Sequence, residues 1–410
     1  MPSEYSLPKA CAAEKPGGRN MTSPSFRVSA AFLILRIISP ASFFSLEVTR
    51  PPYHVLSFLI ECQEGESCSE RTLRKSAIMR TVPLSATLFA VLLCCAVAAP
   101  QSRDNGSEKS TVTKSRLQKI TSMYAFEGFV YALDNCPSWF ELVQDFGQMR
   151  AKGARNVITF DYCGDGADAS YYGEVIQAAG FVGLNIIPLA WTLLIGNQTL
   201  ADTAIPKINA VTKAVIENPE PVLAVALGDE PLFDNDFGSA DNLAKFIRQM
   251  KTDFASAGLS DIPVSTSELA FGWQSSGNIT EMVDAVDFFM INNFPYFAFD
   301  ATTGGSNISW ADFLNDMNYY ASIAQGKPLL VTQTGWPSNE DEFAPNSPDV
   351  VASVPSEEAY WDLLDSHCED FFKAKNIGWM WRSWDDTIEG WGVKNPNGTN
   401  KWNFKARRTC

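Results

Sequence analysis

Residues 222–257 read VLAVALGDEPLFDNDFGSADNLAKFIRQMKTDFASA and contain the pattern that predicts the fold. An apolar run from Val222 to Gly228 is followed by two carboxylates and then by an amphipathic stretch from Asp241 to Ala257. The first part is typical of a buried strand and the last part is typical of a helix. Strands that alternate with helices along a chain indicate a parallel sheet.

The same unit recurs on both sides of this segment. Apolar or aromatic runs predict eight strands, at 126–132, 156–162, 183–191, 222–228, 262–267, 286–292, 328–332 and 377–383. The stretches between them predict helices at 139–152, 171–179, 205–217, 241–257, 310–323 and 356–375, with a shorter one that ends near residue 285. Eight strands alternating with helices predict an α/β fold of the (β/α)8 TIM barrel type, which usually takes about 250 residues and tolerates insertions. An open, doubly wound sheet is the alternative, although no Gly-rich nucleotide loop follows the first strand.

The composition excludes some classes of function. Of the 410 residues, 46% are hydrophobic, so the chain can bury a large core. The net charge of -15 is unlike the basic surface of a nucleic-acid binder, and we expect no nucleic-acid partner. Only two histidines, His54 and His367, are present, which assigns acid–base chemistry to carboxylates and predicts neither a metal nor another cofactor.

The first 99 residues differ from the remainder, because all eleven tryptophans lie after them. Met79-Arg80, an apolar stretch and small residues before Pro100 are typical of a secretory signal peptide, with a signal anchor as the alternative. The chain is therefore divided into four segments: an over-extended gene model or disordered region at 1–78, a signal peptide at 79–99, a polar leader at 100–121, and one barrel domain at 122–410. We expect a secreted protein without a membrane span in its mature form.

Cysteines and glycosylation motifs agree with secretion. After signal cleavage four cysteines remain, an even number that predicts two disulfides in an oxidising compartment. Three connectivities are possible, and proximity in sequence favours Cys136 with Cys163 and Cys368 with Cys410. Five acceptor motifs for N-glycosylation follow the signal, at Asn105, Asn197, Asn278, Asn307 and Asn397.

Side chains at the carboxyl ends of barrel strands point into the active site. The fourth strand ends in Leu227-Gly228-Asp229-Glu230-Pro231, where two adjacent carboxylates follow an apolar run. A barrel mouth offers such carboxylates partial burial and a substrate, whereas a core would penalise them. We therefore predict Glu230 as the main catalytic residue with Asp229 beside it, and Glu268 near the end of the fifth strand as a further acid. The alternative is a pair that begins a solvated loop.

Aromatic residues gather at the ends of later strands. Flat rings beside carboxylates and amides suit a sugar, which has a C–H surface to stack on and hydroxyls that form hydrogen bonds. Trp379 and Trp381 alternate along strand eight, where core packing is an equally good interpretation. The candidates for a sugar-binding groove follow the strands: Asn293, Tyr296, Trp336, Trp384 and Trp391.

Four stretches together resemble glycoside hydrolase family 17, the β-1,3-glucan endohydrolases and related wall transglycosylases. They are Leu227-Gly228-Asp229-Glu230, VDFFMINNFPYF at 286–297, TQTGWPS at 332–338, and Trp384-Asp385-Asp386 through Glu389-Gly390-Trp391-Gly392. The likeness runs in order from residue 126 to residue 393. It implies a (β/α)8 barrel, a retaining mechanism, a proton donor after strand four and a nucleophile after strand seven.

The resemblance also assigns roles to individual residues. Glu230 matches the proton donor, which would protonate the leaving oxygen and then act as a base. Asp386 and Glu389 resemble auxiliary acids of the strand-eight loop. Two positions depart from the family pattern: Asp229 stands where the family usually has Asn, and Gln333 stands where it has the nucleophilic Glu. An amide cannot form the glycosyl ester that a carboxylate forms.

Compared with the family pattern, position 333 lacks a carboxylate and position 229 has an additional one, so the site still contains two carboxylates. Asp229 or Glu268 could supply the second one. A separation of about 5–5.5 Å from Glu230 would favour a covalent route, and about 6.5–9.5 Å would favour an inverting one. One hypothesis is a secreted, wall-associated and monomeric β-1,3-glucan hydrolase or transglycosylase that uses Glu230, with Gln333 aligning the substrate. The other is a catalytically silent glucan-binding wall protein.

Overall fold

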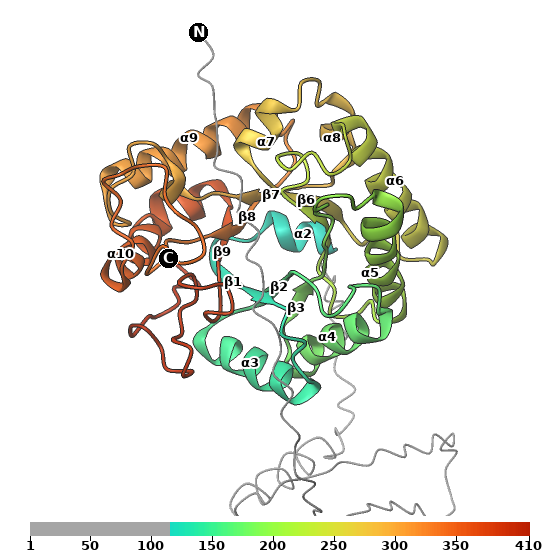
Figure 1. The fold of residues 1–410 in the computed structure, drawn as a ribbon, viewed down its shortest axis with the longest axis horizontal. Helices are drawn as coiled ribbons and strands as arrows, with labels where there is room; N and C mark the ends of the chain where they lie inside the picture. The colour runs from blue at the N-terminus through green and yellow to red at the C-terminus, as the bar shows by residue number, and fades with distance from the viewer. Residues whose placement is uncertain (1–114) are drawn as a thin grey trace, which may run out of the picture. The chain divides into compact units, whose positions relative to one another are not determined.

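The computed structural model describes residues 115–410. The predicted gene-model extension at 1–78, the signal peptide at 79–99 and the sequon at Asn105 lie outside the described residues. The residues that are described form one body in which helices surround a parallel sheet (Figure 1).

The sheet forms a barrel of parallel strands, and the predicted fold class is confirmed. Neighbouring strands pair in the order β3-β2-β1-β9-β8-β7-β6-β5-β4. The strands are β1 (Ala125–Ala132), β2 (Asn156–Phe160), β3 (Asn185–Ile187), β4 (Leu189–Ala190), β5 (Val225–Asp229), β6 (Val264–Leu269), β7 (Phe289–Asn292), β8 (Leu329–Thr334) and β9 (Gly378–Trp381). Because β3 and β4 follow each other directly in the chain, the ends of this order meet and the barrel closes.

The run predicted as one strand at 183–191 is divided at Pro188, which explains why the structure has nine strands where eight were predicted. Proline has no N–H to donate to a ladder. β3 pairs with β2, whereas β4 pairs with β5. The N–H of Leu189, the first residue of β4, donates to the Thr159 hydroxyl at 2.9 Å. The interruption therefore leaves the eightfold arrangement intact.

Helices cover the outside of the barrel, largely where the periodicity predicts them. They are α3 (Trp139–Lys152), α4 (Ala169–Val182), α5 (Ile205–Glu217), α6 (Ala240–Ser256), α7 (Ala270–Ser275), α8 (Thr280–Ala285), α9 (Asn307–Ile323) and α10 (Val354–Ser366). Short helical segments are η1 (Leu200–Ala204), η2 (Pro295–Phe297) and η3 (Cys368–Lys373). The predicted helix at 356–375 is thus α10 followed by η3.

Residues 116–121 form helix α2 (Arg116–Thr121), so the polar leader predicted to reach residue 121 is wrong for this part of the chain. Arg116 donates to the carbonyls of Val222 at 2.7 Å and Pro219 at 2.9 Å, and it pairs with Asp261. Ile120 is completely buried. These partners precede β5 and β6, so α2 belongs to the end of the barrel where the strands begin.

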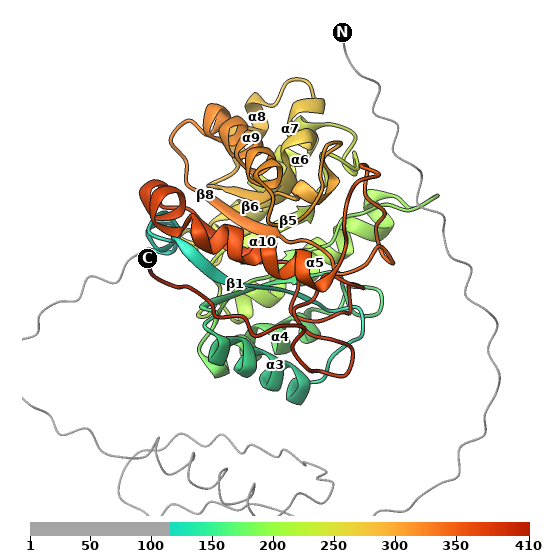
Figure 2. The same ribbon diagram turned by 90° about the vertical axis from the view of Figure 1, so that its left-hand side faces the viewer.

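The segment after β9 is extended and takes the place that a last helix would occupy (Figure 2). Its Trp402 and Phe404 are buried against Trp361 of α10. The Phe126 N–H at the start of β1 donates to the Arg407 carbonyl at 3.1 Å. The carboxyl-terminal segment therefore covers the seam between β9 and β1.

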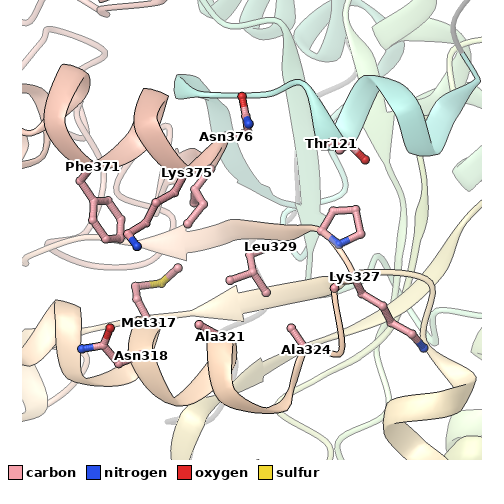
Figure 3. A pocket seen from close by; sticks show the side chains of 13 residues that line it. Thr121, Met317, Asn318, Ala321, Ala324, Lys327, Leu329, Phe371, Lys375 and Asn376 are labelled. Carbon is pink, nitrogen blue, oxygen red and sulfur yellow. The ribbon is translucent and has the colours of Figure 1, made fainter.

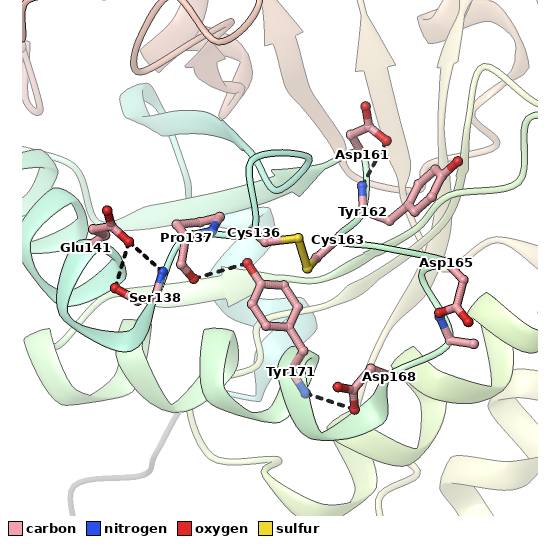
Figure 4. The surroundings of a disulfide bond; sticks show 11 residues. Cys136, Pro137, Ser138, Glu141, Asp161, Tyr162, Cys163, Asp165, Asp168 and Tyr171 are labelled. Carbon is pink, nitrogen blue, oxygen red and sulfur yellow. Dashed lines mark hydrogen bonds between the residues drawn. A yellow bond between two sulfur atoms is a disulfide. The ribbon is translucent and has the colours of Figure 1, made fainter. Parts of the chain in front are cut away.

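Both predicted disulfides are confirmed. Cys136 and Cys163 join the loops that follow β1 and β2 (Figure 4). Cys368 and Cys410 fix the carboxyl-terminal segment to η3.

Candidate active site

Asp229 and Glu230 lie at the carboxyl end of β5, and the backbone there has unusual dihedral angles. Gly228 has φ +82°, and a Cβ at this position would lie 2.7 Å from Pro231 and 2.8 Å from the Thr192 hydroxyl. Glu230 itself has φ +55°, a conformation that non-glycine residues seldom adopt. Its N–H donates to the Ser267 carbonyl of β6 at 2.7 Å, which fixes the direction of the side chain.

Asn292, the last residue of β7, connects the two carboxyl groups. Its Nδ2 donates to Asp229 Oδ1 at 3.1 Å and to Glu230 Oε1 at 2.8 Å. The Ser267 hydroxyl in turn donates to Asn292 Oδ1 at 2.6 Å, which fixes the amide orientation. Because both bonds start from one nitrogen, the two acceptor oxygens are no farther apart than the two bond lengths together. That separation is below the range of about 6.5–9.5 Å typical of inverting glycosidases.

Gln333 lies in β8 between Asp229 and a buried arginine. Its Nε2 donates to Asp229 Oδ1, and to the Ser267 hydroxyl at 3.2 Å. Its Oε1 accepts from Arg382 Nη1 at 2.8 Å. Both ends of the amide are therefore engaged, and the arginine reaches the carboxylates only through a neutral group.

Burial sets the protonation of this cluster. Desolvation, followed by the neighbouring Asp229 charge, raises the pKa of Glu230 to about 8. Desolvation also raises the pKa of Asp229, against the opposing influence of Arg382. Burial lowers the pKa of the Arg382 guanidinium, and the two carboxylates act in the other direction. A Glu230 that holds its proton at neutral pH has the property required of a general acid.

Glu268 is not placed as an alternative second carboxylate. Its Oε2 accepts from the Leu232 N–H at 2.7 Å, and its Oε1 accepts from the Leu269 N–H at 2.8 Å. The side chain is completely buried. One oxygen supports backbone in the loop after β5 and the other supports the end of β6, which leaves Asp229 as the carboxyl group beside Glu230.

The predicted groove residues are buried instead of lining an open groove. Asn293, Tyr296, Trp336, Trp384 and Trp391 each have an exposed fraction of at most 1%. The Trp336 indole donates to a backbone carbonyl at 3.0 Å, and the Asn293 amide donates to another at 3.0 Å. Since protein covers these side chains, they shape the loops around the mouth and offer no ring face to a sugar in this conformation.

The two predicted auxiliary acids have different surroundings. Asp386 accepts from the Gly392 N–H at 3.0 Å and pairs with Lys401 at 2.8 Å. Lys401 also pairs with Glu357 at 3.3 Å, and both of these side chains are almost completely buried. Asp386 therefore stabilises the loop after β9. Glu389, on the same loop, is exposed to solvent.

Sequence reasoning did not single out Arg382, Asn292 or Ser267. Arg382 was visible as the one cation among the tryptophans at the end of the last strand, and Asn292 as the amide that ends the run before the Asn293 loop. Their roles depend on which strand ends lie together, since β5, β6, β7, β8 and β9 are successive neighbours only in the folded barrel.

A pocket of about 400 Å³ lies at the opposite end of the barrel, where β8 begins (Figure 3). Its lining includes Thr121, Met317, Leu329, Phe371 and Lys375. None of the predicted site residues lines this pocket. It is therefore separate from the Asp229–Glu230 cluster.

The described part of the chain contains neither a cluster of metal ligands nor a helix that could span a membrane. Between residues 115 and 410, three or more His, Cys, Asp or Glu side chains nowhere come together in a way that could hold a metal ion. Over the same residues, no helix has the length and hydrophobicity to span a membrane.

Solved structures with similar folds support the barrel assignment. An active-site mutant of the Rhizomucor miehei β-1,3-glucanosyltransferase in complex with laminaritriose aligns with a TM-score of 0.54 and 24% identity, covering 70% of this chain and 98% of that chain. An endo-laminarinase from Formosa aligns with a TM-score of 0.52 and 14% identity, covering 65% and 81%. At these identities the likeness concerns the fold alone.

Curated relatives are fungal. A probable glucan endo-1,3-β-glucosidase eglC of Aspergillus niger is 24% identical over 261 residues, which cover 59% of this chain and 54% of the relative. The protein of the same name from Aspergillus fumigatus is 25% identical over 285 residues, covering 64% and 60%. A probable β-glucosidase btgE of Aspergillus flavus is 24% identical, covering 68% and 42%. The chain thus spans about half the length of these relatives.

The model of one protein family matches residues 128–399, which is most of the described barrel and includes every strand except part of β1. That family is described as the BtgE/BtgC glycoside hydrolase domain. The matched segment contains the Asp229–Glu230 pair, Asn292, Gln333 and Arg382. The chain belongs to the BtgE/BtgC glycoside hydrolase domain family.

Proposed function

We propose that this protein is a secreted enzyme that acts on β-1,3-glucan at the carboxyl end of the barrel, with Glu230 as acid and base. The observation that carries the proposal is the Glu230 carboxyl group: it lies at a strand end, is partly exposed, and has a pKa raised to about 8 beside a second carboxyl group. The names of the relatives supply the substrate class. Membership in glycoside hydrolase family 17 remains a prediction from the motifs.

In the proposed reaction, Glu230 donates its proton to the glycosidic oxygen as the bond to the anomeric carbon breaks. The leaving sugar departs as an alcohol, and Glu230 becomes a carboxylate. It then accepts a proton from water or from an acceptor sugar hydroxyl, whose oxygen bonds to the anomeric carbon. Water gives hydrolysis and a sugar gives transglycosylation.

Asp229 is assigned the second carboxylate function. It is only 7% exposed, and its Oδ1 accepts from Asn292 and Gln333. A negative charge here stabilises positive charge that develops at the anomeric carbon and favours the protonated form of Glu230. The short separation from Glu230 supports a retaining rather than an inverting outcome. Anomeric configuration of the first product, followed over time, tests that assignment.

Substitution of Glu230 provides the direct test. Glu230→Gln removes the transferable proton and preserves the side-chain shape, so sugar release from a laminarin-type glucan should fall by about 10²–10⁴-fold. Glu174→Gln on α4, an exposed carboxylate that is not among the predicted site residues, is the matched control. An unchanged rate for Glu230→Gln with intact folding would refute the assignment.

The buried Gln333 favours a second candidate, a glucan-binding wall protein with little turnover. The Gln333 amide cannot act as the nucleophile that a carboxylate would provide. Its nitrogen and its oxygen both form hydrogen bonds within the protein. The double variant Asp229→Asn/Gln333→Glu distinguishes the two candidates. A large gain in hydrolysis with unchanged glucan affinity supports the silent binder, whereas a loss of hydrolysis supports the enzyme that uses Asp229.

A further inference from the structure

The ends of β2 and β4 carry aromatic side chains that lead away from the catalytic cluster. The Arg382 guanidinium carbon lies 4.3 Å from the centre of the Phe160 ring, at the last residue of β2. The Trp191 ring, directly after β4, meets Phe160 edge to face with centroids 4.7 Å apart. Phe160 is buried, whereas Trp191 is half-buried. Trp191 is thus partly exposed, unlike the buried Trp336, Trp384 and Trp391 after β8 and β9.

Asp161 adds a carboxylate beside these rings. It follows Phe160 with φ +58°, and its Oδ1 accepts from the Tyr162 N–H at 2.9 Å. Its side chain points away from the nearby disulfide (Figure 4). Asp161 directly follows Phe160, whose ring contacts Arg382, so Asp161 lies on the side of the mouth next to the catalytic cluster. Left-handed backbone at a non-glycine residue is frequent at binding sites, where the surrounding structure holds it in place.

Lys207 of α5 supplies a cation behind Asp161. Its ammonium nitrogen lies 3.2 Å from the centre of the Tyr162 ring, and the residue is only 2% exposed. Asp161, Asp165 and Asp236 are the carboxylates that act on its charge. This cation opposes the burial that raises the pKa of Asp161, and so supports the ionised carboxylate.

The Cys136–Cys163 disulfide fixes the loop that carries Asp161 and Tyr162 (Figure 4). The Tyr171 hydroxyl donates to the Pro137 carbonyl at 3.3 Å and joins the loop after β1 to helix α4, which follows the Asp161 loop. Asp161 is therefore presented by a covalently anchored segment. Such pre-organisation lowers the entropy lost when a ligand binds.

We propose that Trp191 and Asp161 form a sugar-binding subsite beside the Asp229–Glu230 cluster, on the β2–β4 side of the mouth. The inference rests on the proposed function, because its ligand is a glucosyl unit of the same glucan chain, away from the bond that is broken. The exposed indole surface packs on the C–H face of the sugar, and the Asp161 carboxylate accepts hydrogen bonds from its hydroxyls. The charge of Lys207 favours the ionised form of Asp161 and opposes the influence of burial.

The test compares glucan oligosaccharides of increasing length. Trp191→Ala should weaken binding of oligosaccharides long enough to reach the subsite by about five- to tenfold, the value of an aromatic contact. Asp161→Asn keeps the side-chain shape and should weaken binding by about tenfold through loss of charge-assisted hydrogen bonds. Laminaribiose, bound at the cluster alone, should be affected by neither change. Calorimetry in the Glu230→Gln background measures these affinities without turnover.

Exposed residues outside the mouth provide controls. Phe181→Ala on α4 removes a ring that is 68% exposed, and Asp284→Asn on α8 removes an exposed carboxylate. Neither should alter glucan affinity. If glucan binding depends on Trp191 but the protein releases no sugar, the subsite proposal is supported and the proposed enzymatic function is rejected. Equal affinity of the parent protein, Trp191→Ala and Asp161→Asn for long oligosaccharides would overturn the subsite, whatever the rate.

Discussion

The two ends of the barrel each hold an arginine near a buried carboxylate, but they connect the charges differently. Where the strands begin, Arg155 bonds directly to Glu127 Oε1 at 2.8 Å, and Asn156 donates to Glu127 Oε2 at 3.0 Å. Where the strands end, Arg382 bonds to the Gln333 amide, which in turn donates to Asp229. One end has a direct ion pair, and the other has a neutral group between the charges.

A raised pKa is common to both ends and does not distinguish them. Burial raises the pKa of Glu127 to about 7 and that of Glu230 to about 8. The difference is in what each carboxyl group can still reach. Both oxygens of Glu127 are engaged, and its side chain is only 1% exposed. Glu230 is partly exposed, and the charge of Arg382 acts on both Glu230 and Asp229. Accessibility and incomplete charge pairing, rather than the pKa shift, indicate which end does the chemistry.

Removal of Arg382 should produce the largest effect. Arg382→Met leaves the buried Asp229 and the partly exposed Glu230 without a cation and leaves the Gln333 Oε1 without its donor. The free energy of unfolding should fall by about 3–5 kcal/mol, the cost of leaving a buried charge without its compensating partner. Urea denaturation measures this change, and glucan hydrolysis at low temperature should fall with it. A stable, fully active Arg382→Met variant would show that the amide-linked arrangement is dispensable.

Burial of Glu127 at the other end should make stability depend on pH, because it raises the pKa of this group against the opposing influence of Arg155. The pKa of Glu127 is raised from 4.5 to about 7, so the folded state binds a proton more tightly than the unfolded state. The stabilisation is complete below pH 4.5 and is lost as the pH rises through 7. A shift of this size corresponds to about 3 kcal/mol. Glu127→Gln should remove this part of the decrease in the free energy of unfolding with rising pH.

Urea denaturation of Glu127→Gln between pH 4.5 and 7.5 measures that decline. Glu220→Gln, which changes an exposed carboxylate, is the control and should reproduce the parent slope. Glucan hydrolysis at a fixed pH should be the same in all three proteins. A slope for Glu127→Gln equal to that of the parent would mean that Glu127 titrates normally in the folded state.

Substitution of Gln333 tests the hydrogen bonds at the carboxyl end of the barrel separately from those at the other end. In the single variant Gln333→Glu an oxygen replaces the nitrogen that donates to Asp229 and Ser267, which places two acids in contact. Stability at neutral pH should fall by about 2 kcal/mol, and adding Asp229→Asn should restore most of it, because contacting residues couple by about 0.5–3 kcal/mol. A double-mutant cycle in urea measures the coupling. Additive effects would show that Asp229 and Gln333 act independently.

Much of the barrel could be predicted from the sequence, because its strands are short apolar runs at regular spacing. The helix predicted at 205–217 is found at Ile205–Glu217, and 139–152 is found at Trp139–Lys152. The break at Pro188 was not predicted, since the missing N–H matters only once β2 and β5 lie on either side. Helix α2 was missed because its six residues carry one buried apolar side chain, Ile120, and their contacts are to distant segments.

The candidate site could be predicted in part. Glu230 and Asp229 follow from a strand-end rule that needs no coordinates. The roles of Asn292 and Arg382 could not be predicted, because each depends on hydrogen bonds across strands far apart in sequence. Trp336 and Trp384 were expected in an open groove, but sequence does not show which face of a loop is covered. Trp191 ended a predicted strand, so its partial exposure was not foreseen.

The smallest predicted effect concerns Arg155, the counterpart of Arg382 at the other end of the barrel. Its guanidinium is 36% exposed, and Glu127 can keep its proton when the cation is removed. Arg155→Met should therefore lower stability at neutral pH by about 1 kcal/mol, close to the upper value for exposed pairs, and should leave glucan hydrolysis unchanged. Urea denaturation of Arg155→Met beside Arg382→Met makes the comparison with one kind of substitution. Equal losses for the two variants would mean that the direct ion pair and the amide-linked pair are energetically equivalent, and that the difference between the two ends is in exposure alone.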